Sequence, residues 1–232
     1  MTDKDIIKFN LDNIKNNIEK ACIKANKKSQ DIKIVGVTKT IDIEKIKILK
    51  DFGINHFGEN KAQELLQKHS HIDNCFWHFI GNLQTNKVKQ IIDKVCMIQS
   101  VNSLKLLQEI NNRAFAIQKN IPILLEINIA NEPTKHGILP QDLDYLLSNI
   151  TNFKNITLNG LMCIAPFVEN PQQNAKYFAK MRKLFVDIST KNTHNINMQY
   201  LSMGMTNDYH IAIEEGANIV RIGTGIFGNR NY

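Results

Sequence analysis

The sequence predicts an α/β fold in which eight parallel strands close into a single (β/α)8 barrel, preceded by an extra N-terminal helix. Eight short apolar runs rich in β-branched residues recur along the chain, and helical patterns fill most of the gaps between them. No GxGxxG motif follows the first run, which disfavours an open dinucleotide-binding sheet. A length of 232 residues is ordinary for one such barrel. We therefore expect one domain over residues 1–232, with residues 1–28 as a helix packed on the barrel.

The elements can be followed in order along the chain. Residues 4–26 carry apolar side chains at steps of three and four, the pattern of an amphipathic helix, and residues 43–52 repeat it before Gly53, a helix C-cap. Further helical patterns begin at Ala62, cover residues 104–118 and run through Phe178 and Phe185. The predicted strands are residues 34–40, 54–57, 76–80, 95–101, 123–130, 156–164, 198–201 and 218–222.

Composition narrows the class of protein. Lys and Arg number 29 against 22 Asp and Glu, a net charge of +7, but no dense basic tract interleaves with aromatic residues, which disfavours nucleic-acid binding. No signal-peptide core or membrane-length apolar run is present, so we expect a cytoplasmic protein without a membrane partner. Neither the cysteines nor the histidines have the spacing of a metal site, and none is predicted: Cys22, Cys75, Cys96, Cys163, His56, His69, His71, His78, His136, His194 and His210.

Lys39 stands where the first predicted strand, IVGVTKT, runs out. A lysine at such a position can extend into solvent, or it can be an amine held in a low-dielectric pocket, where it loses its proton and attacks a carbonyl. The residue alone does not decide between these readings.

Polar residues at the ends of the other strands favour the second reading. In a parallel barrel the carboxyl ends of all strands meet at one rim, the face that carries active sites. The polar residues at or just beyond those ends are Lys39, Asn60, Gln84, Asn86, Lys135, Ser202 and Arg221.

The last two strands are followed by glycine-containing turns that suit a phosphate. Ser202, Met203 and Gly204 follow the seventh strand, and Gly223 and Thr224 follow the eighth. Backbone amides at such turns bind phosphate, and many barrels hold one at these two loops. The alternative for either turn is that its glycine only allows the chain to turn tightly.

Arg221 lies within an otherwise apolar strand, where an unpaired guanidinium would be costly. It should therefore meet a ligand or a carboxylate. Glu59 and Glu126 are the candidate partners if the pair is purely structural.

These residues belong to segments that resemble one family. VTKT at 37–40, FGEN at 57–60, WHFIGNLQTNK at 77–87, EINIANEPTKHG at 126–137, GLMCI at 160–164, LSMGM at 201–205 and VRIGTGIFG at 220–228 are similar to the pyridoxal 5'-phosphate (PLP) homeostasis proteins of the YggS/PROSC type. The resemblance covers nearly the whole chain from residue 34. The chain departs from the expected pattern at Thr38, Lys61 and Asn82.

The resemblance implies a TIM barrel like the N-terminal domain of alanine racemase, with PLP as cofactor. It implies that Lys39 forms an internal aldimine, a Schiff base, with PLP and that Arg221 faces the pyridine nitrogen. Asn60 would lie near the ring, and the phosphate would be held by Ser202, Met203, Gly204, Gly223 and Thr224.

Function is then expected to be intracellular PLP homeostasis without catalysis. An arginine beside the pyridine nitrogen cannot keep it protonated, so the ring is a weak electron sink. Only Asn231 and Tyr232 follow the last turn, so we expect no second domain to shield a substrate. The expected partners are PLP and, as recipients, PLP-dependent apo-enzymes, and the expected state is a monomer. The alternatives are a PLP-dependent amino-acid racemase or lyase, and a cofactor-free Schiff-base aldolase acting on a phosphorylated sugar.

Overall fold

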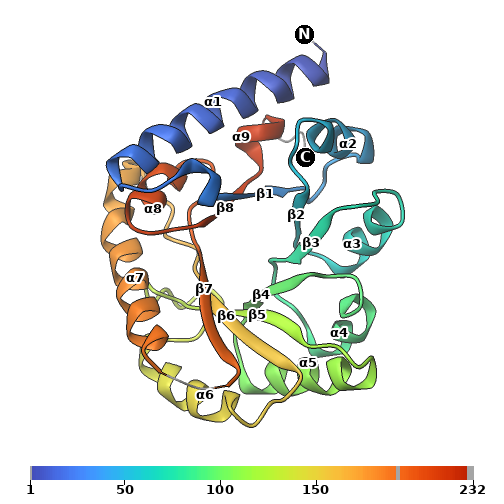
Figure 1. Cartoon of the computed structure of the whole chain (residues 1–232), viewed down its shortest axis with the longest axis vertical. Helices are drawn as coiled ribbons and strands as arrows, with labels where there is room; N and C mark the ends of the chain where they lie inside the picture. Colours follow the sequence, from blue (N-terminus) through green and yellow to red (C-terminus); the bar gives the residue numbers. More distant parts are fainter. Residues whose placement is uncertain (1, 192–193, 229–232) are drawn as a thin grey trace.

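The computed structural model describes residues 2–191 and 194–228, and its centre is a closed barrel of eight parallel strands in sequential order (Figure 1). Each strand pairs with the next in the sequence, and β1 closes the barrel against β8, with Val35 opposite Arg221. The strands are β1 (Lys33–Val37), β2 (His56–Glu59), β3 (Phe76–Phe79), β4 (Met97–Val101), β5 (Ile121–Glu126), β6 (Ile156–Met162), β7 (Ile196–Ser202) and β8 (Ile219–Ile222). The predicted fold class is therefore confirmed.

Helices surround the barrel on its outside (Figure 1). They are α1 (Asp3–Lys24), α2 (Ile43–Asp51), α3 (Ala62–His69), α4 (Thr85–Ile91), α5 (Leu104–Ala116), α6 (Leu143–Ile150), α7 (Ala175–Ser189), α8 (Tyr209–Glu214) and α9 (Thr224–Phe227), with short 3-10 turns at Ser29–Asp31, Pro140–Asp142 and Pro171–Asn174. Gly53 ends α2 with φ +88°, and its N–H donates to the Lys50 carbonyl, as predicted. The sequence pattern did not single out α4 and α6.

Helix α1 packs across the outside of the barrel against α2, α8 and α9 (Figure 1). Its buried stripe includes Ile7, Leu11, Ile14 and Ile18, which are at most 4% exposed. The Asn10 side chain donates to the Ile226 carbonyl at 3.0 Å. The N-terminal helix therefore supports the outside of the region that follows β8.

Strands β1 and β5 end before their predicted last residues because the chain turns early. Strand β1 ends at Val37, where the Ile41 N–H donates to the Thr38 carbonyl and Thr40 takes φ +60°. Strand β5 ends at Glu126, and Asn128 then accepts a hydrogen bond from the Glu132 N–H through its side chain. Asparagine side chains compete in this way with sheet hydrogen bonding. Among the described residues, no helix has both the length and the apolar character needed to cross a bilayer.

Candidate functional site

A cavity of about 410 Å³ opens where the carboxyl ends of the strands meet, and we call it the mouth cavity. Its volume lies within the range of small-molecule sites. Its lining comes from the loops after β1, β5, β6, β7 and β8 and consists of Val37, Lys39, Lys135, Ile164, Ala165, Pro166, Phe167, Val168, Pro171, Asn174, Met205, Thr206, Asn207, Asp208, Arg221, Gly223 and Thr224. Four of the predicted site residues are in this set: Lys39, Arg221, Gly223 and Thr224.

Lys39 lies at the edge of the mouth cavity and is partly buried. Side chains alternate along a strand, so Val35, Val37 and Lys39 share one face. Val37 lines the same cavity, which places this face toward the barrel interior. The amine therefore extends from the end of β1 into the opening rather than toward the surrounding helices.

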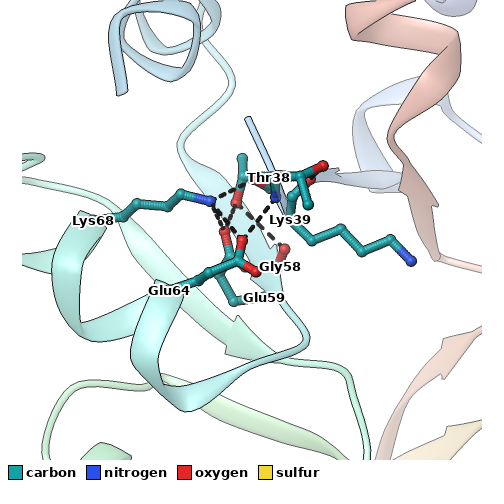
Figure 2. A network of polar contacts seen from close by, with 7 residues as sticks. Thr38, Lys39, Gly58, Glu59, Glu64 and Lys68 are labelled. Carbon is teal, nitrogen blue, oxygen red and sulfur yellow. Dashed lines mark hydrogen bonds and ion pairs between the residues drawn. The ribbon is translucent and has the colours of Figure 1, made fainter. Parts of the chain in front are cut away.

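Thr38, on the opposite face, belongs to a buried ionic cluster behind Lys39. The Lys68 ammonium donates to the Thr38 carbonyl at 2.6 Å, to Glu59 at 2.8 Å and to Glu64 at 3.2 Å. The Thr38 hydroxyl donates to Glu59 at 2.6 Å. Figure 2 shows Lys39 pointing away from this cluster. Glu59 and Lys68 are 0% and 6% exposed, so each charge would be costly to bury without the other.

The same cluster holds an unfavourable backbone conformation next to Lys39. Thr40 has φ +60°, which is rare for a β-branched residue. Its N–H donates to Glu64 at 2.7 Å, and Glu64 is in turn bound by Lys68. Although burial opposes it, the hydrogen bonds from Thr40 and Lys68 lower the pKa of Glu64. A strained residue held by several contacts is typical of a functional loop.

Arg221 reaches the base of the mouth cavity from β8 and is 3% exposed. Its guanidinium donates to the Ser202 hydroxyl at 2.7 Å and to the Cys163 carbonyl at 2.8 Å. Neither predicted carboxylate makes these contacts, and Glu59 pairs with Lys68 instead. Burial raises the pKa of the Glu126 carboxyl, and the nearby Arg221 charge opposes that rise. Two neutral acceptors thus hold the guanidinium, which has five N–H donors in all.

Ser202 connects Arg221 to a hydrogen-bonded chain through the barrel interior. Its hydroxyl donates to Gln99 Oε1 at 2.7 Å, and the Gln99 amide nitrogen lies 3.0 Å from Nδ1 of His78. Strands β4 and β7 are separated in the barrel by β5 and β6, so the Gln99–Ser202 bond must cross the interior. Nothing in the sequence around Gln99 predicts its contact with Ser202.

The turn after β7 brings its predicted residues close to, but not onto, the cavity wall. Ser202, Met203 and Gly204 are all buried, and none lines the mouth cavity. Gly204 has φ +90°, and a Cβ there would lie 2.8 Å from Cα of Tyr209. Only glycine fits this turn against α8. The turn delivers Met205 and Thr206 to the cavity.

The turns after β7 and β8 contact one another at Thr206. The Thr206 hydroxyl lies 3.1 Å from the Thr224 hydroxyl and accepts from the Gly225 N–H at 3.1 Å. Asp208 fixes the same turn by accepting from the Met205 N–H at 2.7 Å and from Asn174 at 2.8 Å. The sequence pattern identified the two turns but not the Asp208–Asn174 pair, because residues 34 positions apart give no local signal.

Asn60 lies beside a second cavity rather than in the wall of the first. That cavity, of about 260 Å³, is formed by residues after β2 and β3, including Lys61, Asn82 and Gln84. Within the described part of the chain, the buried Asn60 Oδ1 has no hydrogen-bond partner. Of the other polar residues expected at the rim, Lys135 lines the mouth cavity, where its ammonium donates to the Ala165 carbonyl at 3.1 Å and pairs with Glu132 at 2.9 Å.

Comparisons with known proteins agree with this geometry. A family model described as "Alanine racemase, N-terminal domain" matches residues 9–231. A "Pyridoxal phosphate homeostasis protein" of Aquifex aeolicus is 40% identical, over 96% of this chain and 97% of the relative. A solved protein of Bifidobacterium adolescentis described as unknown has a TM-score of 0.90 at 30% identity, covering 97% of this chain and 96% of that one.

A further solved structure carries a ligand. PipY of Synechococcus elongatus, described as a COG0325 family member with PLP bound, has a TM-score of 0.79 at 27% identity. The match covers 85% of this chain and 93% of PipY.

Proposed function

The chain belongs to the alanine racemase N-terminal-domain family and, within it, to the pyridoxal phosphate homeostasis proteins, and from this premise we propose that it binds PLP in the mouth cavity and holds it without turning over an amino acid. The single observation that supports this most strongly is that Lys39, Arg221 and the turn at Gly223 and Thr224 line one cavity. The motif resemblance is confirmed at the level of the family.

The side chains of the mouth cavity suit a phosphorylated aromatic ring. Lys39 and Arg221 supply positive charge, and Thr206 and Thr224 supply hydroxyls. Ile164, Phe167 and other apolar residues form the rest of the wall and can pack against a ring. Cations, hydroxyls and apolar contacts are the combination that an aromatic phosphate ester requires.

In this proposal the turns at Gly223–Thr224 and Ser202–Gly204 hold the phosphate. Gly223 and Thr224 do so directly, because they line the cavity. Ser202, Met203 and Gly204 do so as the backbone turn that positions Thr206 beside Thr224. The Ser202 hydroxyl also orients Arg221.

Lys39 is the residue we propose for covalent attachment. The aldehyde of PLP supplies an electrophilic carbon with which a primary amine condenses, with loss of water. The condensation uses the neutral amine, and Lys39 lines the same cavity as Arg221. Asn60 would approach the ring from the second cavity through its Oδ1, which has no hydrogen-bond partner among the described residues.

In this proposal the chain does not catalyse a reaction, because Arg221 does not protonate the ring nitrogen and the other ionisable groups of the cavity are held by hydrogen bonds or ion pairs. Arg221 has only donors to offer a ring nitrogen, which leaves that nitrogen unprotonated and the ring a weak electron sink. Lys135 and Asp208, which also line the cavity, are engaged with Glu132, Asn174 and the backbone. Neither is free to move a proton at a substrate carbon.

We also propose that PLP-dependent apo-enzymes receive the cofactor from a monomeric protein. Three apolar side chains around the cavity are exposed, namely Ile164, Phe167 and Met205. Exposed apolar groups beside a ligand site can contact a recipient protein.

An absorption spectrum of the purified chain tests the binding proposal. With added PLP, we expect a visible band that disappears on borohydride reduction, and peptide mapping should place the reduced adduct on Lys39. A chain that stays colourless and unlabelled would contradict the proposal and favour the cofactor-free aldolase.

Exchange of the α-proton of an amino acid with solvent tests the absence of catalysis. We expect the PLP-loaded chain to exchange α-protons of alanine and other amino acids no faster than free PLP at the same concentration, measured by proton NMR in heavy water. Exchange at enzymatic rates, about 1 per second or faster, would favour the racemase or lyase instead.

A further inference from the structure

Three potential metal ligands meet near the opposite end of the barrel from the mouth cavity. His56 begins β2, His78 lies in β3, and Cys96 directly precedes β4, so the three side chains come from neighbouring positions around the barrel. One nitrogen or sulfur atom of each residue lies within 4.8 Å of the others. Nδ1 of His56 is 2.9 Å from Nε2 of His78, and Cys96 Sγ is 3.5 Å from the same Nε2.

We propose that His56, His78 and Cys96 bind a thiophilic metal cation, Cu⁺ or Zn²⁺, at this end of the barrel. Imidazole nitrogen and thiolate sulfur are the ligands these ions prefer. Around tetrahedral zinc, adjacent ligand atoms lie roughly 3.3–3.6 Å apart. The Sγ–Nε2 distance already has this value, and the two imidazoles need to separate by only about 0.4 Å.

The protonation states of the three groups suit binding that releases one proton. Burial, reinforced by the Lys33 charge, lowers the pKa of His56 to about 4, and burial and His56 lower that of His78 to about 3, so both imidazoles are neutral. Burial raises the pKa of Cys96 to about 12. The cation therefore replaces the thiol proton: the S–H bond breaks, a sulfur–metal bond forms and the proton leaves to solvent.

The partial exposure of the cluster allows a cation to enter. His56 and Cys96 are half-buried, whereas His78 is 1% exposed. Lys33 lies close enough to influence all three groups, and its charge opposes excess positive charge at the site. Cu⁺ with one thiolate is neutral overall, so Lys33 favours Cu⁺ over Zn²⁺.

Gln99 opposes metal binding because it favours the wrong tautomer of His78. The Gln99 amide N–H donates to Nδ1 of His78, which leaves the proton of His78 on Nε2, the atom nearest the other ligands. A metal at Nε2 requires the proton on Nδ1 and an acceptor facing it. A glutamate at position 99 would accept from both His78 and Ser202, so it should favour the metal.

Titration with Co²⁺ and with Cu⁺ tests the site on the reduced, purified chain. We expect one ion per chain, with thiolate-to-cobalt charge-transfer absorption for Co²⁺, and competition with a Cu⁺ chelator to measure Cu⁺ affinity. Cys96→Ser should remove the charge-transfer band and weaken binding at least about 100-fold, whereas the matched control Cys75→Ser should retain both. Gln99→Glu should tighten binding by about tenfold.

Protection of Cys96 from alkylation provides a measurement that needs no variant. Bound metal should slow iodoacetamide labelling of Cys96 in the unsubstituted chain and leave the labelling of Cys75 unchanged. The proposal is wrong if neither ion binds, if a folded Cys96→Ser chain keeps the charge-transfer band, or if metal leaves the labelling of Cys96 unaffected.

Discussion

Replacing Lys39 by alanine is expected to abolish the borohydride-fixed attachment of PLP to the chain. Lys39 is the lysine that extends from β1 into the mouth cavity, and alanine leaves no amine at that position. The phosphate contacts after β7 and β8 remain, so non-covalent binding should persist with affinity reduced at least about tenfold, or 1.4 kcal/mol. Mass spectrometry after reduction measures the covalent part, and equilibrium dialysis measures the rest.

Lys135→Ala is the matched control for this prediction. Lys135 lines the same cavity, but its ammonium is already bound to the Ala165 carbonyl and to Glu132. We expect the Lys135→Ala chain to keep the label on Lys39. A Lys39→Ala chain that still yields the same quantity of reduced adduct would show that another amine carries the cofactor, and the Lys39 assignment would be lost.

The sequence predicted the fold and grouped part of the candidate site, because both depend on local patterns. Apolar strand runs are separated by helical segments, and polar residues at strand ends must share one rim in a parallel barrel. The sequence pattern alone therefore groups Lys39, Arg221, Gly223 and Thr224 at one rim. The structure places these four around one cavity.

The contacts that the sequence did not reveal join residues on different elements. Glu59 and Lys68 lie only nine positions apart, but a lysine in a helical sequence pattern gives no sign that its ammonium turns back to a strand carboxylate. Gln99 and Ser202 are 103 positions apart. Likewise, His56, His78 and Cys96 have no recognisable metal spacing and meet only because adjacent parallel strands align them.

The Lys68→Met chain is expected to be destabilised by about 3–5 kcal/mol, since the substitution leaves the Glu59 carboxylate buried without its cation. Urea unfolding at pH 7 measures this loss. The loss of Lys68 should also affect the loop that carries Lys39. Lys68 binds the Thr38 carbonyl and Glu64, which together hold Thr40 at φ +60° beside Lys39. We therefore expect PLP attachment at Lys39 to slow in this variant.

A double variant separates loss of the ion pair from loss of packing. In Lys68→Met with Glu59→Gln, neither position of the buried pair carries a charge, and the Thr38 hydroxyl can still donate to the glutamine carbonyl. Breaking one member of a buried pair costs much more than replacing both, so most of the stability should return. If the single variant were as stable as the parent chain, Glu59 would have to be protonated at neutral pH, in line with the rise that burial causes in its pKa. The cluster would then position Thr38 through neutral hydrogen bonds, and Lys68 would no longer be required to hold the loop that carries Lys39.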